Sequence, residues 1–128
     1  MSPSDLMYRT VYGTIQEVIK PYEIYESAPD ASAKYPFVWL DYERVPIRTN
    51  NDLLGGYTIN IRLYGTNSQR SLLNEMNGVI YDALNNIRQA GNYHMSLGRF
   101  ETNINKENDQ GTALLHFSSD AEFSWNKH

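Results

Sequence analysis

Four carboxylates form an acidic group whose spacing suits general acid–base catalysis or cation binding. Asp41 and Glu43 alternate along one expected strand, and Asp120 and Glu122 alternate along another. A sheet that brings the two strands together would place all four side chains on one face, as a hydrolase or isomerase would require. Such an enzyme also needs a concave pocket in which carboxylate titration is displaced. A solvated sheet face explains the same pattern without chemistry, and we favour that interpretation.

Other patterns for catalysis or metal binding are missing from the sequence. The three histidines are His94, His116 and His128, and they do not cluster with carboxylates at metal-ligand spacing, so we interpret them as exposed or structural. There is no cysteine, which excludes disulfides, thiolate zinc sites and thiol nucleophiles. No Gly-x-Ser-x-Gly elbow or phosphate-binding glycine loop occurs. We therefore expect no enzymatic activity, no cofactor and no metal.

Length and composition indicate one folded domain over residues 1–128. Hydrophobic residues make up 41% of the 128 residues and charged residues 20%, which is an ordinary globular balance. The net charge of −4, without runs of Lys or Arg, argues against specific nucleic-acid binding. No apolar run approaches the roughly 20 residues that span a bilayer, and the first residues lack a signal-peptide pattern. We therefore expect no membrane partner and a cytoplasmic location.

Two amphipathic helices follow from apolar residues at intervals of three and four. The first is expected to begin near Ser4 or Asp5 and to be closed by Pro21. The second follows Asn67-Ser68 and ends near Gly91. The first apolar stripe contains Met7, Val11, Ile15, Val18 and Ile19, and the second contains Leu72, Met76, Val79, Ile80, Ala83, Leu84 and Ile87, opposite Asn74, Asn77 and Tyr81.

Alternating apolar residues predict the strands. Short strand 22–26 is followed by strands at 35–44, 57–64, 93–101 and 112–125, with polar loops at 45–56 and 102–111. The strand at 57–64 directs Tyr57, Ile59, Ile61 and Leu63 to the core and Thr58, Asn60 and Arg62 outward. In 35–44, Val38, Leu40 and Tyr42 share one side, and Phe37, Trp39, Asp41 and Glu43 the other.

These elements predict an α+β fold in the order α-β-β-β-α-β-β. Because neighbouring strands usually pair, we expect an antiparallel sheet of about four main strands. Both helices would pack on one face of that sheet, since each carries a single apolar stripe.

The chain resembles the tail terminator, or tail completion, proteins of long-tailed bacteriophages. The resemblance rests on the order of the elements and spans nearly the whole chain. The segments that carry it are Tyr35-Pro36-Phe37-Val38-Trp39-Leu40, the polar insertion that follows, Tyr57-Thr58-Ile59-Asn60-Ile61-Arg62-Leu63-Tyr64-Gly65, the capped helix ending in Ala83-Leu84, and the aromatic last strand Leu115-His116-Phe117-Ser118-Ser119-Asp120-Ala121-Glu122-Phe123.

The resemblance implies structural work in the virion. Members of that family assemble, typically as hexameric rings, on the end of the tail tube, stop its polymerisation and offer a docking surface for the filled head. The implied partners are other copies of the chain, the tail tube protein and a head–tail connector or head-completion protein. The implied location is the head-proximal end of the tail, after assembly in the cytoplasm of the bacterial host.

A closed ring needs two different contact patches on each subunit. Ten tyrosines and two tryptophans provide suitable side chains, because aromatic residues are enriched in interfaces. We expect one patch on the open sheet face and the other on a helix surface or a sheet edge, with the two polar loops reaching toward the tube or head. The expected interface residues are Phe37, Trp39, Arg44, Arg48, Asn50, Asp52, Arg62, Tyr64, Tyr81, Lys106 and Asp109.

An alternative stays open beside the ring-forming protein. The chain would then be another head-to-tail joining or adaptor protein, whose aromatic sheet face binds a partner without forming a ring.

Overall fold

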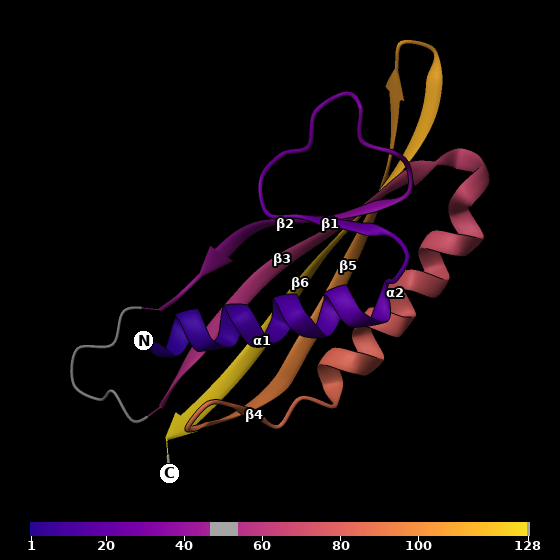
Figure 1. Ribbon diagram of the computed structural model, residues 1–128. Coiled ribbons are helices and arrows are strands. Elements are labelled where there is room, and N and C mark those ends of the chain that lie inside the picture. Colours follow the sequence, from indigo (N-terminus) through magenta and orange to yellow (C-terminus); the bar gives the residue numbers. More distant parts are fainter. Residues whose placement is uncertain (47–53, 128) are drawn as a thin grey trace.

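A computed structural model, which describes residues 1–46 and 54–127, has an α+β fold with two helices and a six-stranded sheet (Figure 1). The strands lie in the order β1-β2-β3-β6-β5-β4. The elements are α1 (Pro3–Val18), β1 (Glu23–Tyr25), β2 (Phe37–Arg44), β3 (Leu54–Thr66), the 3₁₀ turn η1 (Asn67–Gln69), α2 (Arg70–Asn85), β4 (Gln89–Ala90), β5 (Tyr93–Asp109) and β6 (Thr112–Lys127).

The sheet differs in detail from the expected four antiparallel strands. Two short strands, β1 and β4, extend its two edges, and β1 pairs with β2 in parallel while the other pairs are antiparallel. The parallel pair arises because the connection after Tyr25 carries the chain back before it enters β2 at Phe37. Adjacency in sequence alone favours an antiparallel pair, which is why the prediction was wrong at this edge.

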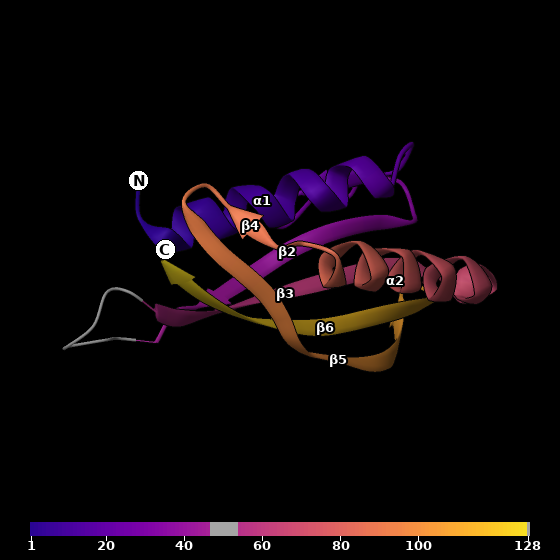
Figure 2. The ribbon, with the colours of Figure 1, turned by 90° about the horizontal axis from the view of Figure 1, so that it is seen from below.

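Both helices lie on one side of the sheet, which curls around them (Figure 2). On α1 and α2, apolar residues that follow one another at intervals of three or four positions are buried. They pack against the inward side chains of β3 and β6. The predicted core face of β3 is confirmed: Tyr57, Ile59, Ile61 and Leu63 are all buried. We call the side of the sheet that faces the helices the inner face and the opposite side the outer face.

The first helix begins slightly earlier than predicted. The Oγ atom of Ser2 accepts a hydrogen bond from the backbone N–H of Asp5 at 3.2 Å, and Pro3 occupies the first helical turn. Proline is favoured there because its fixed φ suits a helix and its missing N–H has no partner to lose. The helix therefore starts at Pro3 instead of Ser4 or Asp5.

The second helix is rotated relative to its predicted stripe. Leu73 is completely buried, whereas Val79, which was expected in the core, is 40% exposed. Leu73 fits over Gly65 of β3, where a Cβ atom would lie 2.9 Å from its Cδ1 atom. Asn77 was expected to face outward, but it donates to Thr102 Oγ1 at 3.1 Å and accepts from Ser119 Oγ at 3.2 Å on the inner face.

A bulge in β2 changes which side chains share a face. The register shifts between Leu40 and Glu43, so the strict alternation predicted for 35–44 ends at Leu40. Beyond the bulge, Glu43 lies on the inner face and accepts a hydrogen bond from the Tyr57 hydroxyl at 2.7 Å. Tyr42 lies on the outer face and donates to Asp120 at 3.0 Å. The prediction that Glu43 shares a face with Asp41 was therefore wrong.

The polar segment 102–111 is mostly strand, although it was predicted to be a loop. β5 continues to Asp109, which pairs with Thr112 across the two-residue turn Gln110-Gly111. Both turn residues have positive φ, 49° and 86°, as a tight hairpin turn requires. The polar composition reflects exposure, because every residue from 103 to 113 is exposed. This tip of the β5–β6 hairpin projects past both helices (Figure 1).

The rotation of α2 can be tested by unfolding. We expect Leu73→Ala to lower the free energy of unfolding by about 2–5 kcal/mol, because it leaves a cavity above Gly65. The matched variant Val79→Ala on the same helix should change it by no more than about 0.5 kcal/mol. Urea denaturation followed by circular dichroism measures both. Equal losses in the two variants would contradict the described orientation of the helix.

Candidate functional site

The outer face carries five of the expected interface residues, namely Phe37, Trp39, Arg44, Arg62 and Tyr64. On β3 it carries Thr58, Asn60, Arg62 and Tyr64, which are the outward side chains of an alternating strand. Their cross-strand partners on β6 are Glu122, Asp120, Ser118 and His116, in that order. The face therefore divides into a polar part around Asn60 and an aromatic part around Tyr64.

Asn60 is the centre of the polar part. It was expected to be exposed, but its side chain is only 1% exposed. Its Nδ2 group donates to Ser118 Oγ and to Asp120 Oδ1, each at 3.0 Å, and its Oδ1 atom accepts from Arg62 Nε at 2.8 Å. Because the buried amide is satisfied on both sides, it holds Arg62 and Asp120 in fixed positions.

Ion pairs surround this centre. Arg62 lies 3.0 Å from Asp41, and each side chain is about one quarter exposed. Arg44 lies 3.7 Å from Asp120, and Arg99 contacts both Glu101 and, at 4.0 Å, Glu122. Opposite charges thus alternate over the face, and each of these outer carboxylates has an arginine close by.

The acidic group predicted from the sequence does not assemble as one site. Asp41, Asp120 and Glu122 lie on the outer face with arginine partners, while the β2 bulge moves Glu43 to the inner face. This arrangement does not support general acid–base chemistry by the four carboxylates acting together.

Glu43 instead borders a cavity of about 280 Å³ that sequence reasoning missed. There Tyr8 donates to Glu26, and burial, followed by this hydrogen bond, raises the pKa of Tyr8. Burial and the hydrogen bond to Glu43 likewise raise the pKa of Tyr57. The two tyrosines come from α1 and β3, which are far apart in sequence, so no local pattern pointed to them.

The aromatic part of the outer face is a row of stacked rings. Phe37 stacks on Tyr64 with centroids 5.3 Å apart, and Tyr64 stacks on His116 at 4.3 Å. Tyr35 extends the row beyond Phe37 at 5.5 Å. The row crosses β2, β3 and β6 because these residues are cross-strand neighbours.

This stacking corrects the expected role of Phe37. Phe37 is only 6% exposed, since rings of Tyr25, Tyr35 and Tyr64 pack around it, so it is not an open contact residue. Trp39 and Tyr64 are half-buried and keep part of their surface open. Arg62 lies over the Trp39 ring at 5.6 Å and so joins the aromatic part to the polar part.

His116 ends the row as a buried histidine. It is 5% exposed, and its Nδ1 atom lies 3.2 Å from Glu107 Oε1. Burial lowers the pKa of His116, the positive charge of Arg62 lowers it further, and Glu107 acts in the opposite direction. Among the described residues the Nε2 atom has no hydrogen-bond partner. The structural interpretation of this histidine is confirmed, although its ring is covered.

The remaining expected interface residues that the structure describes lie on α2 and on the β5–β6 hairpin. Tyr81 is 40% exposed on α2, where it packs edge-on against Phe100 at 5.3 Å. Lys106 and Asp109 are exposed on the hairpin. The structure therefore brings Trp39, Arg44, Arg62 and Tyr64 together on the outer face and places Tyr81 and Lys106 elsewhere, while Asp109 lines a cleft together with Trp39 and Tyr64. Arg48, Asn50 and Asp52 lie outside the described residues.

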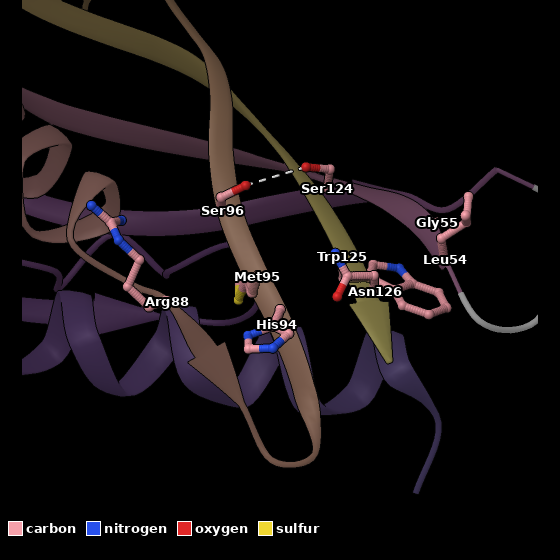
Figure 3. A pocket seen from close by; sticks show the side chains of 9 residues that line it. All are labelled: Leu54, Gly55, Arg88, His94, Met95, Ser96, Ser124, Trp125 and Asn126. Carbon is pink, nitrogen blue, oxygen red and sulfur yellow. Dashed lines mark hydrogen bonds between the residues drawn. The ribbon is translucent and has the colours of Figure 1, made fainter. Parts of the chain in front are cut away.

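A further pocket of about 470 Å³ lies where β3, β5 and β6 end near the C-terminus (Figure 3). Ser96 and Ser124 face each other across it with hydroxyl oxygens 3.3 Å apart. Trp125 covers Gly55, where a Cβ atom would lie 2.6 Å from the indole. None of these residues was expected in a site, because the pocket is assembled from separate strand ends.

The buried state of His116 predicts a pH dependence of stability. The unfolded chain binds this proton near pH 6.5, whereas the folded chain binds it only at lower pH, so stability is full above about pH 6.5 and declines as the pH falls. The variant His116→Phe keeps a stacked ring without titrating and should lose less stability between about pH 7.5 and 5. Urea denaturation at each pH measures this.

The control for that prediction is Asn74→Phe, at an exposed position of α2 that carries no titratable group. It should keep the pH profile of the unchanged protein. Identical profiles for the His116 variant and the unchanged protein would contradict the assignment.

In residues 1–46 and 54–127, no three His, Asp or Glu side chains are placed to hold a metal ion. No helix in this part of the chain is long and apolar enough to cross a membrane. No protein-family model and no curated protein matches the sequence.

Proposed function

We propose that this chain is a structural protein of a long-tailed bacteriophage that forms a ring on the head-proximal end of the tail tube. In this role it ends polymerisation of the tube and provides the surface to which the head is joined. The role requires neither catalysis nor a cofactor. It is supported by the phage resemblance in the order of elements and by the α+β fold with two helices on one side of the sheet.

The observation that carries the proposal is the projecting tip of the β5–β6 hairpin. Residues 103–113 are all exposed and extend past the helices, so they add little to the core of a single subunit. Ile104, an apolar side chain 43% exposed, lies in this tip together with Lys106 and Asp109. A long ordered hairpin with exposed apolar and charged side chains is well suited to contact a second chain.

A ring also needs a second, different patch for the hairpin or sheet to meet. Because Phe37 is buried, we assign the aromatic contact to Tyr81 on α2, which is 40% exposed. The ion-paired outer face, with Arg44 and Arg62, then remains for the tube protein or the head–tail connector. Paired charges at such a surface contribute mainly to orientation and partner choice.

A second candidate function is an adaptor that joins head and tail proteins as a monomer. The partly open rings of Trp39 and Tyr64 favour it, because they form a compact aromatic patch on the outer face. The two candidates differ in self-association, which only the ring requires.

The ring proposal predicts a characteristic picture in negative-stain electron microscopy. When the purified protein is added to tail tubes of the same phage, we expect caps at one end only, and tubes that polymerise in its presence should be limited in length. Light scattering after size-exclusion chromatography should detect an oligomer in the presence of tube protein. Decoration along the sides of the tubes, or a strict monomer under these conditions, would contradict the proposal.

The role of the hairpin can be tested by shortening it. Replacing residues 108–113 with Asn-Gly joins Glu107 to Leu114, which already pair across the hairpin, so the register is kept. We expect the melting temperature to stay within about 3 °C, because only exposed residues are removed, while capping of the tubes is lost.

The matched control changes an exposed ion pair elsewhere, with Glu17→Gln and Lys20→Gln at the end of α1. This variant should still cap the tubes. A shortened hairpin that caps as well as the control would show that residues 108–113 at the end of the tip are not a contact.

A further inference from the structure

A cleft of about 570 Å³ lies at the base of the hairpin tip, separate from the polar part of the outer face. One wall is the connection between β1 and β2, with Asp30, and the other wall is the hairpin, with Glu107 and Asp109. Its floor includes the rings of Tyr35, Trp39 and Tyr64. Figure 1 shows this connection beside the hairpin.

The cleft is negatively charged. It has three carboxylates, and no lysine or arginine is among the described residues that line it. Asp30 accepts hydrogen bonds from the backbone N–H and hydroxyl of Ser32, which lower its pKa and keep it ionised. Glu107 lies 3.2 Å from the buried His116, and the lowered pKa of this histidine favours its neutral form at pH 7.

This charge state differs from the rest of the outer face. There, Asp41, Asp120 and Glu122 each have an arginine within 4.0 Å. Among the described residues, neither Asp30 nor Asp109 has such an ion pair. The carboxylates of the cleft therefore keep their charge available for a cation from another molecule.

The floor of the cleft also favours a cation. The face of an aromatic ring attracts positive charge, and a guanidinium can stack on a ring while its N–H groups donate to carboxylates. The same chemistry occurs within this chain, where Arg62 lies over Trp39 beside Asp41. Tyr35 is 38% exposed, so part of its ring remains open to such a contact.

We propose that this cleft binds an arginine-containing segment of a partner polypeptide. The guanidinium contacts the tyrosine rings and donates to Asp30 and Asp109. A segment of chain fits better than an isolated cation, because pockets of about 300–1,000 Å³ enclose drug-sized ligands, which are much larger than one ion. The side chains of Ala28, Ala31 and Ala33 in the wall are small and uncharged. The inference rests on the cleft alone and goes beyond the proposed ring.

The probe is a blocked peptide, acetyl-Gly-Arg-Gly-Arg-Gly-amide, titrated into the ¹⁵N-labelled protein and followed by NMR. We expect saturable shifts at the indole N–H of Trp39 and little change at Trp125, which lies outside the cleft. Binding should weaken as salt rises, because the attraction is between exposed charges. The citrulline analogue has the same shape without the charge and should not bind.

Two double variants, each of which removes two negative charges, test the location of the site. Asp30→Asn with Asp109→Asn should weaken binding of the arginine peptide about fivefold to tenfold. Both changes are conservative at exposed positions, and asparagine at 30 can still accept from Ser32. The control pair, Glu101→Gln with Glu122→Gln, removes the same charge from the outer face beyond the cleft and should leave the affinity within about twofold.

The proposal would be overturned by absence of binding, by equal binding of the citrulline peptide, or by equal weakening in the two pairs of variants. Tyr35→Ala should also weaken binding, and an unchanged affinity there would remove the aromatic contact from the proposal. None of these results depends on tail tubes. A protein that caps tubes without binding the peptide would leave the ring role intact and reject only the cleft.

Discussion

The antiparallel pairing of β3 with β6 is the constraint on which the rest of the structure depends. It runs without a shift from Leu54 opposite Asn126 to Thr66 opposite Leu114, in the middle of the sheet. Since side chains alternate along both strands, this register sends one apolar set to the helices and one polar set to the outer face. A slip by one residue would bury Arg62 in the core, so the pairing is strongly specified.

Buried hydrogen-bond groups reinforce this register on both faces. On the inner face, Ser119 contacts Thr102 at 2.7 Å and donates to Asn77, which ties β6 to β5 and to α2. On the outer face, Asn60 ties β3 to Ser118 and Asp120 of β6. A slipped strand would leave these buried groups without partners, at a cost of about 1–3 kcal/mol each. The polar groups thus favour a unique alignment as well as contributing stability.

The surfaces proposed to meet other chains lie where this regular sheet is interrupted or extended. The β2 bulge removes Glu43 from the outer face, and the shift in β5 near Gly98 places Arg99 opposite Glu122. The hairpin continues past the region covered by helices, and the β1–β2 connection lies beside it to form the acidic, aromatic cleft. The central sheet thus carries the core, while its ends present partly exposed rings and, among the described residues, carboxylates without a lysine or arginine partner. A structural role in an assembly uses such ends without disturbing the core.

The sequence by itself determined the α+β class, the two helices and the core face of β3, because periodicity of apolar residues is a local property that burial must satisfy. It also placed Tyr81 correctly on an exposed helix surface. Only the tertiary structure decided that Leu73 and not Val79 enters the core, that Phe37 is covered by neighbouring rings, and that Asp30 and Asp109 share a cleft. Each of these features depends on which distant segment of the chain packs against the residue. In addition, a strand bulge or a tight turn changes the face to which the following side chains point, and the residues of the bulge or turn show no clear sequence pattern.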